Sequence, residues 1–329
     1  MPIFSQFSSG GYTRGKGFAG GGRAPAAAAG LYTFVNATFT PGGQTGRSGP
    51  SLSQVRNGLT GIDVNTWKNN TSFVNSNNGI ITWTVPTTGS YTFELGGARG
   101  ANAPGRSNTG GYGARFTTNS VSLTEGQSIR IQIGQTGTTV GTNDGAGGGG
   151  GTSVYNSSTG TLIAVSGGGG GAGSSQNGRN AQNQTSGGGG LHGDPGAVIS
   201  NGGSGGNGGN QNVTSGAAGT CAYSGAGWSG NGPGTSQCGR SGGSAAQSLS
   251  GSAVGGQGEN GIGVGGFGGG GGGANNNGYG GGAGGYSGGG AGGFPGGGGG
   301  GFGGSFSNHG INSFTTNSNT PGFVTITLQ

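Results

Sequence analysis

Residues 162–171 read Leu162-Ile163-Ala164-Val165-Ser166-Gly167-Gly168-Gly169-Gly170-Gly171, so an apolar run passes directly into five consecutive glycines. The first half is typical of a buried β-strand. The second half has no side chain to bury, so any regular structure that it forms must be held by backbone hydrogen bonds. The fold therefore depends on how strands and glycine runs combine.

Glycine accounts for 98 of the 329 residues, far above the roughly 7 % of ordinary proteins. Only 27 % of the residues are hydrophobic and 5 % are charged, which is too little apolar material for a conventional core throughout the chain. Collagen is excluded, because it needs glycine at every third position and abundant proline, whereas this chain has 10 prolines and unbroken glycine runs at 147–151 and 296–301. Regular strand patterns around the glycines argue against simple disorder.

Apolar and polar residues alternate in several segments, as in Ile129-Arg130-Ile131-Gln132-Ile133, and this period of two gives each strand one buried and one solvated face. Leu52, Val55 and Leu59 would share one face of a short helix. The strands expected from these patterns cover residues 31–39, 80–85, 90–95, 129–133, 152–155, 162–165 and 323–328. Together they predict an antiparallel β-sandwich.

The glycine-rich stretch 167–305 lies between two of these strands, so we expect it to be an insertion that leaves the sandwich and returns to it. A polyproline II backbone has three residues per turn and directs its N–H and C=O groups outward, and glycine helices of this kind can approach several neighbours closely. Residues 202–210, Gly-Gly-Ser-Gly-Gly-Asn-Gly-Gly-Asn, place Ser204, Asn207 and Asn210 on one edge of such a helix, as at the rim of a lattice.

We therefore predict an all-β fold, an antiparallel β-sandwich of the jelly-roll or TNF-like type with an inserted bundle of polyglycine II helices. The expected parts are an extended N-terminal arm at 1–30, a small segment at 31–79 and a glycine-rich domain at 80–329. Within that domain we expect the sandwich at 80–166 and 320–329 and the bundle at 167–319.

An ordered series of motifs resembles the glycine-rich domain of the anaplastic lymphoma kinase and leukocyte tyrosine kinase receptors. These motifs are Trp83-Thr84-Val85-Pro86-Thr87-Thr88-Gly89-Ser90-Tyr91-Thr92-Phe93, Gly97-Ala98-Arg99-Gly100, Leu123-Thr124-Glu125-Gly126, Ile133-Gly134-Gln135-Thr136-Gly137, and residues 147–154 and 162–171. The resemblance implies a β-sandwich that carries polyglycine helices.

A second resemblance concerns residues 31–85, with Tyr32-Thr33-Phe34-Val35-Asn36-Ala37, Thr45-Gly46-Arg47-Ser48-Gly49-Pro50-Ser51-Leu52 and the Trp83-Thr84-Val85-Pro86 segment. These segments look like virion structural proteins of marine tailed bacteriophages. Long glycine segments divided by polar and aromatic turns are also similar to the tail-fibre-tip adhesins of T4-like phages, and this similarity implies a rigid head whose distal loops touch a host receptor.

Recognition residues are expected in the polar segments 174–186, 211–224, 225–237 and 274–279 that interrupt the glycines, because loops on rigid scaffolds commonly carry binding. The candidates for receptor binding are Tyr223, Trp228, Tyr279, Arg179 and Asn276, with the three aromatic residues as exposed anchors. The alternative is that these aromatic rings cover the ends of glycine helices or pack on the sandwich. Packing against the sandwich is the role expected of Phe267, Tyr286, Phe294, Phe302 and Phe306.

The N-terminal arm mixes aromatic and basic residues that a partner could grip, and we expect it to attach the chain to other virion proteins. The attachment candidates are Phe4, Phe7, Tyr12, Arg14, Lys16, Phe18 and Arg23. The net charge of +6 is otherwise spread thinly, so no nucleic-acid interface is predicted. Neither a classical secretion signal at Met1-Pro2-Ile3-Phe4 nor an apolar stretch of about 18 residues is found, so no membrane insertion is expected.

No catalytic constellation is expected. The six acids (Asp63, Glu94, Glu125, Asp144, Asp194 and Glu259) are scattered singly, and His192 and His309 lie far apart in sequence. Gly261-Ile262-Gly263-Val264-Gly265-Gly266 matches a dinucleotide fingerprint only formally, because the strand-turn-helix context is missing. We expect no cofactor and no metal, and Cys221 and Cys238 could be one bridge or two free thiols.

The expected function is that of a non-enzymatic phage virion protein, a tail fibre or fibre-tip component on the particle surface that recognises the host surface, through either a glycan or a protein. A capsid fibre or decoration protein and a secreted protein-binding module are the alternatives. A polysaccharide depolymerase ranks last, because such sites need paired carboxylates.

Overall fold

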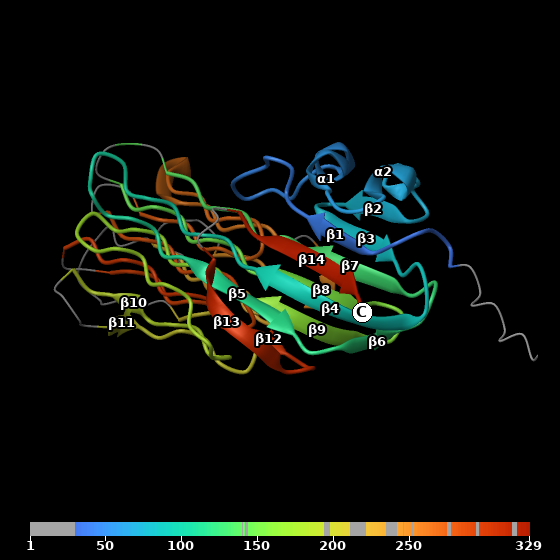
Figure 1. Cartoon of the computed structure of the whole chain (residues 1–329). Coiled ribbons are helices and arrows are strands. Elements are labelled where there is room, and N and C mark those ends of the chain that lie inside the picture. The colour runs from blue at the N-terminus through green and yellow to red at the C-terminus, as the bar shows by residue number, and fades with distance from the viewer. Residues whose placement is uncertain are drawn as a thin grey trace, which may run out of the picture.

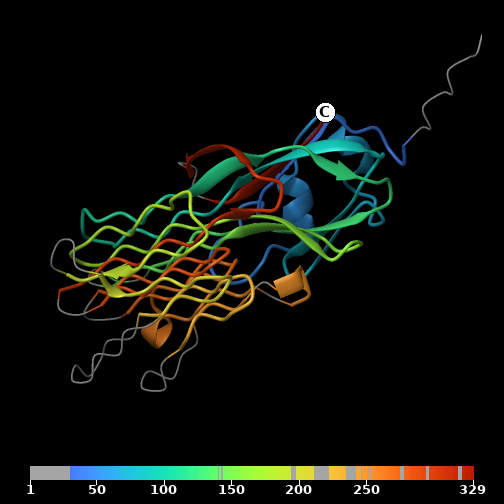
Figure 2. The same ribbon diagram turned by 90° about the horizontal axis from the view of Figure 1, so that it is seen from below.

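The computed structural model describes residues 30–139, 141, 144–193, 198–210, 222–234, 242–245, 247–251, 253–274, 278–293, 296–317 and 321–329. The molecule is elongated (Figure 1). Two β-sheets lie at one end, and glycine-rich segments extend from them side by side toward the other end (Figures 1 and 2).

Each of two antiparallel sheets contains six strands. The first has the order β1 (Asn36–Phe39), β14 (Phe323–Leu328), β4 (Gly89–Gly96), β5 (Gly113–Thr118) and β13 (Ile311–Asn317), with β6 (Val121–Leu123) also paired to β4. The second has the order β12 (Phe306–Ser307), β9 (Thr161–Ser166), β8 (Thr152–Asn156), β7 (Ser128–Gln132), β3 (Ile80–Thr84) and β2 (Val74–Asn77). The predicted all-β class is confirmed.

Short elements complete the described structure. They are the helices α1 (Leu52–Gly58) and α2 (Val64–Trp67), the strand pair β10 (Gly190–Leu191) and β11 (Val198–Ser200), and the 3₁₀ turns η1 (Gln247–Leu249) and η2 (Glu259–Gly261). The predicted short helix is α1. Its capping box joins the Ser51 N–H to Gln54 Oε1 at 2.8 Å and the Gln54 N–H to Ser51 Oγ at 3.3 Å, which satisfies two N–H groups at the start of the helix.

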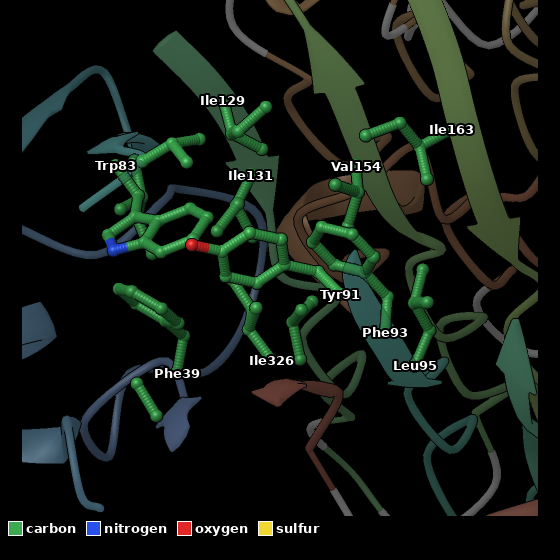
Figure 3. Close-up of a cluster of buried hydrophobic side chains, with 14 of the residues drawn as sticks. Phe39, Trp83, Tyr91, Phe93, Leu95, Ile129, Ile131, Val154, Ile163 and Ile326 are labelled. Atoms are coloured by element: carbon green, nitrogen blue, oxygen red, sulfur yellow. The ribbon is translucent and has the colours of Figure 1, made fainter. Parts of the chain in front are cut away.

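The alternating sequence pattern produces one core shared by both sheets (Figure 3). Tyr91, Phe93 and Leu95 of β4 are buried, as are Ile129 and Ile131 of β7, while the residues between them point away from this core. Burying each such side chain stabilises the fold by about 1.5–3 kcal/mol. The period of two therefore predicted the buried faces correctly.

Two ranges differ from the sequence-based expectation. Residues 31–79 contribute β1 and β2 to the two sheets instead of standing apart, and the strand expected at 31–39 covers only Asn36–Phe39. Its first half is irregular because Phe34 and Tyr32 turn their rings onto Trp67 and Trp83, and the Tyr32 hydroxyl donates to the Thr84 carbonyl at 2.5 Å.

At the other end of the chain, β12 and β13 arise within the range 167–319 that was expected to hold only glycine helices. Residues 306–317 have few glycines and complete both sheets, so the sheets extend beyond 80–166 and 320–329.

What we call the glycine region consists of extended segments joined by turns and linked mainly by backbone hydrogen bonds. It comprises residues 97–112, 134–138, 145–151, 167–193, 198–210, 222–234, 242–245, 253–274, 278–293 and 296–304. Residues 202–210 do not form one straight helix here, because Gly205 and Gly206 have φ values of +59° and +89° and make a turn. Ser204, Asn207 and Asn210 are nevertheless exposed, as predicted for a rim.

Candidate binding surface

Residues 145–151 show how the glycine region is held together. Their N–H groups point in turn to three different neighbouring segments and bond to carbonyl oxygens at 2.8–3.1 Å. Gly145, Gly148 and Gly151 donate to Ala274, Gly271 and Gly268; Ala146 and Gly149 donate to Ala172 and Gly169; Gly147 and Gly150 donate to Thr138 and Gln135. The same neighbour therefore returns every third residue.

The carbonyl groups of this segment reach three further neighbours. Gly147 and Gly150 accept from Ala101 and Ala98, Ala146 and Gly149 accept from Gly281 and Gly284, and Gly148 accepts from Gly266. Residues 167–174 repeat the arrangement, since they donate to 278–284, 98–101 and 176–179 and accept from 145–149, 111–114 and 300–303. Each of these two segments thus has six hydrogen-bonded neighbours.

Such close approach requires glycine at most positions. A Cβ atom at Gly149 would lie closer than 3.0 Å to the carbonyl oxygens of Ala98 and Arg99, and one at Gly168 would meet those of Gly149 and Gly150. Where side chains do occur inside, they are mainly methyl groups, such as the buried cluster of Ala101, Ala103, Ala146 and Ala172. Segments 145–151 and 167–174 are thus each cross-linked through the backbone to six neighbours, and glycine is what allows this close packing.

The start of the described chain lies at the end of the molecule that is remote from the glycine region. Strand β4 runs from Gly89 to Gly96 and continues into the glycine region, so Pro86 and Gly89 lie at the end of the sheets remote from that region. Leu31 donates its N–H to the Pro86 carbonyl at 2.7 Å, which places the start of the described chain at this remote end. The first described residue, Gly30, therefore lies on the side of the sheets opposite the glycine region.

Loops from distant parts of the sequence meet at the other end, and we call residues 102–109, 174–177 and 191–193 the distal loops. Asn108 Nδ2 donates to the carbonyls of Gly173 and Ser174 at 3.2 and 2.8 Å, and Gln176 Nε2 donates to Gly193 O at 3.0 Å. Ser175 is joined to residue 297 by a backbone hydrogen bond of 3.0 Å. The glycine region thus ends in a polar surface with fixed loops.

Tyr223 and Tyr279, predicted as exposed anchors, are buried, with exposures of 0 % and 1 %. The prediction was wrong because the neighbouring segments of the glycine region enclose both side chains; Tyr279 packs against Ala222, Ala274 and Ala291. Burial also raises the pKa of the Tyr279 hydroxyl, because the charged form would lose its hydration. The alternative role, packing, is what the structure assigns to these two rings.

The remaining candidates have mixed outcomes. Trp228 is half-buried and packs on Tyr155 of β8 at a ring separation of 5.9 Å, so it is not an exposed anchor and joins the glycine region to a sheet. Arg179 is also partly buried, since it donates to the Gly189 carbonyl at 3.1 Å and lies 5.4 Å from the centre of the Phe302 ring. Asn276 and all seven attachment candidates of the arm lie outside the described residues.

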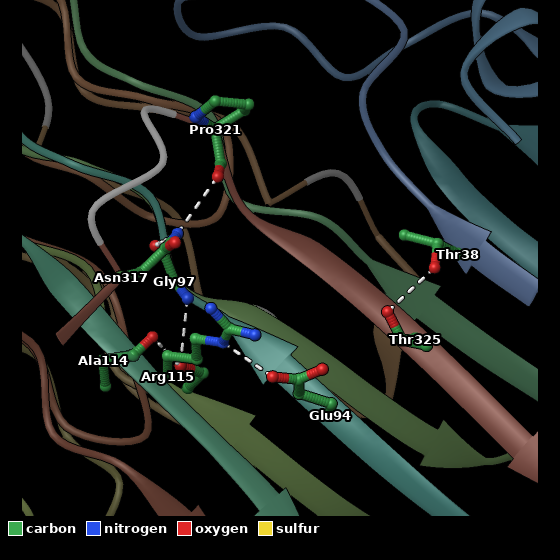
Figure 4. A network of polar contacts seen from close by, with 9 residues as sticks. Thr38, Glu94, Gly97, Ala114, Arg115, Asn317, Pro321 and Thr325 are labelled. Carbon is green, nitrogen blue, oxygen red and sulfur yellow. Dashed lines mark hydrogen bonds and ion pairs between the residues drawn. The ribbon is translucent and has the colours of Figure 1, made fainter. Parts of the chain in front are cut away.

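The predicted packing aromatics behave as expected where the structure describes them. Tyr286 stacks on Phe306 of β12 at 4.6 Å, Phe267 packs against Ile80 of β3, and Phe302 packs against Phe314 of β13. Phe294 lies outside the described residues. Aromatic rings thus secure the junction between sheets and glycine region, together with the buried Asn317, which donates to the carbonyls of Gly97 and Pro321 at 2.8 and 3.1 Å (Figure 4).

A group of surface residues on segments 99–112 and 177–180 was not singled out from the sequence, although Asn177 and Asn180 lie within the expected recognition segment 174–186. Asn177, Asn180 and Asn102 are exposed and use Oδ1 to accept from backbone N–H groups that have no carbonyl partner at the surface. Tyr112 is 36 % exposed, beside Arg99. The available signal was the three-residue spacing of Asn177 and Asn180, which matches the repeat of the hydrogen bonds.

The described residues contain no group of three or more His, Cys, Asp or Glu side chains placed to hold a metal ion. Glu94 and Arg115 form a surface ion pair at 2.6 Å on the first sheet (Figure 4). The Glu94 carboxylate thus has a structural partner. The surface can therefore bind a ligand through amides, guanidinium groups and an aromatic ring.

Comparison of the sequence with protein-family models and with curated proteins found no match. In the described part of the chain, no helix combines the length and the apolar character needed to span a bilayer.

Proposed function

We propose that this chain is a non-enzymatic structural protein of a tailed-bacteriophage virion, a tail fibre or fibre-tip component that displays a rigid glycine-rich head for host-surface recognition. The observation that carries the proposal is the polarity of the molecule. The described chain starts at the remote end of the sheets, beside Pro86, while the distal loops lie at the other end of the glycine region. The resemblance of residues 31–85 to phage virion proteins supports the same conclusion.

We further propose that the glycine region is a bundle of polyglycine II helices and that the two sheets form a sandwich of the jelly-roll or TNF-like type. The first part is supported by the return of the same neighbour every third residue in 145–151 and 167–174, since a polyglycine II helix has three residues per turn. The second is supported by the single core between two antiparallel six-stranded sheets.

Attachment is assigned to the N-terminal arm, with other virion proteins as partners. Leu31, Val35 and Ile62 have exposures of 45 %, 41 % and 50 %, and Val35 accepts at 3.0 Å from Leu328, next to the C-terminus. These apolar side chains lie on the side where the arm joins, so a partner that grips the arm could also cover them. A host glycan or protein would meet the opposite end.

Immunogold electron microscopy of purified virions with antibodies against the glycine region tests the proposal. Label at the tail or its fibres is the expected result. Label on the head shell would replace the tail assignment by the capsid-fibre alternative, and particles without label would overturn a virion role. Secretion of the chain by uninfected cells would instead favour a protein-binding module, and release of reducing sugars from host glycan would refute the non-enzymatic assignment.

A further inference from the structure

The exposed side of segments 99–112 and 177–180 carries a strip of residues suited to a sugar. Its members are Arg99, Asn102, Thr109, Tyr112, Asn177 and Asn180, which we call the amide strip. The two segments lie side by side, because Gly178 and Ala181 donate their N–H groups to the carbonyls of Thr109 and Tyr112 at 3.0 and 2.8 Å.

The asparagines of the strip are fixed by the backbone that they cap. The N–H groups of Thr109 and Tyr112 donate to Oδ1 of Asn177 and Asn180, both at 2.8 Å, and that of Gly110 donates to Oδ1 of Asn102 at 3.0 Å. Each side-chain oxygen is thereby engaged, while the Nδ2 group of each exposed amide remains as a donor for a ligand. Asn177 and Asn180 are three residues apart, which corresponds to about 9 Å along an extended threefold segment.

An aromatic ring and a guanidinium lie beside these donors. Tyr112 is 36 % exposed, and the guanidinium of Arg99 is 5.0 Å from the centre of its ring, a distance typical of a cation–π pair. Arg99 Nε donates to the Gly110 carbonyl at 3.1 Å, which orients the group. Within the described residues this is the one hydrogen bond of Arg99, so its two terminal nitrogens can take a planar acceptor such as a carboxylate.

The two chain segments that carry the strip, residues 97–114 and 174–193, contain Arg99, Arg106 and Arg179 and no aspartate or glutamate. In a chain with only 5 % charged residues, this excess of basic residues favours an anionic ligand at the strip.

We propose that the amide strip is a binding site for an acidic oligosaccharide, one whose sugars carry carboxylates. Arg99 pairs with the carboxylate, the ring of Tyr112 contacts the apolar face of a sugar, and the Nδ2 groups of Asn177 and Asn180 donate to hydroxyl oxygens of two different sugars of the same oligosaccharide. The inference rests on the proposed function in that a host-surface glycan would be the natural ligand.

The test is calorimetric titration of the full chain with a hexasaccharide of galacturonic acid and, for comparison, with neutral hexagalactose. Arg99→Gln should weaken binding of the acidic sugar by about tenfold or more and leave the neutral sugar unaffected, because one charge-assisted contact is lost. Tyr112→Ala should weaken the binding of both sugars. Asn180→Asp keeps the oxygen that caps the Tyr112 N–H but removes the Nδ2 donor and adds a negative charge, so it should also weaken the binding of the acidic sugar.

Asn231→Asp is the matched control, because Asn231 Oδ1 caps the Ala245 N–H at 2.7 Å in another part of the glycine region and is likewise exposed. It should bind like the unchanged chain. Equal binding by all four variants, or no binding of either sugar to the unchanged chain, would overturn the inference.

Adsorption of particles separates this inference from the proposed function. If virions lacking the chain adsorb normally while the purified chain binds the acidic sugar through Arg99 and Tyr112, the proposed function fails and the site stands. If adsorption needs the chain, but the Arg99→Gln and Tyr112→Ala chains support it fully and bind the acidic sugar like the unchanged chain, the proposed function stands and the inference fails.

Discussion

Gly149→Ala tests whether close backbone packing in the glycine region stabilises the whole protein. Gly149 is in the middle of segment 145–151, where the added methyl group would lie closer than 3.0 Å to the backbone of residues 98 and 99. A backbone carbonyl cannot rotate away as a flexible side chain can. The two segments must separate, which weakens the bonds from Ala98 to Gly150 and from Ala101 to Gly147, both 3.0 Å long.

The expected loss follows from these contacts. Inserting a methyl group into a close-packed site costs about 1–3 kcal/mol, and two backbone hydrogen bonds contribute about 0.5–1.5 kcal/mol each, so the free energy of unfolding should fall by about 2–6 kcal/mol. Alanine also restricts the unfolded chain and thereby stabilises by about 0.4–1 kcal/mol. This stabilisation through the unfolded chain is common to glycine-to-alanine changes wherever the backbone tolerates alanine. Comparison with a second glycine-to-alanine variant therefore cancels it.

Guanidinium unfolding followed by far-UV circular dichroism measures the difference, with Gly251→Ala as the control. Gly251 is exposed, and an added Cβ atom there would have no atom within 4 Å. The control should match the unchanged chain or be slightly more stable. If Gly149→Ala unfolds at the same denaturant concentration as Gly251→Ala, the glycine region is not a close-packed support and the reasoning is refuted.

Three further changes probe the sheets and the first helix by the same unfolding assay. Phe93→Ala empties a fully buried site in the shared core and should cost about 3–5 kcal/mol, against less than about 0.5 kcal/mol for the exposed Ser53→Ala. Ser51→Ala removes the capping box of α1 and should cost about 0.5–2 kcal/mol; no loss would mean that the cap is dispensable. Burial raises the pKa of Tyr91 to about 12, so the folded state keeps a proton that the unfolded state loses near pH 10, and stability should fall as the pH rises from 10 toward 12. Tyr91→Phe should make this fall shallower, and an unchanged slope would contradict the assignment.

Most strands of the two sheets were predictable because their side chains alternate; the strands β2, β5, β6, β12 and β13 were not expected from the sequence. Ile129 and Ile131 both point into the core because every second residue of a strand lies on the same face. Residues 306–317 and 74–77 were missed as strands because they are largely polar: β13 and β2 lie at the edges of their sheets, where few side chains are buried. Pairing with a neighbouring strand, and not an apolar face, determines these elements.

The binding surface was less predictable. Tyr223 and Tyr279 were chosen because aromatic residues between glycine runs suggest exposed anchors, yet neighbouring segments enclose both. Asn177 and Asn180 lie in the segment 174–186 where recognition was expected, but neither was singled out, because asparagine in a glycine-rich chain is indistinguishable from a loop residue until the partner of its side-chain oxygen is known. The attachment role of the arm at 1–30 and the binding role of Asn276 remain predictions.

The amino-acid sequence alone determined that this protein would be all-β, that alternating residues would form a shared core, and that a long glycine insertion would leave the sheets and return. Only the tertiary structure decided which glycine segments are neighbours, where the loops converge and which aromatic rings are exposed. The physical reason is that a glycine segment offers the same N–H and C=O groups in three directions and carries no side chain that marks one face as inner. Burial there depends on how many segments surround a residue, and the sequence around that residue does not contain this information.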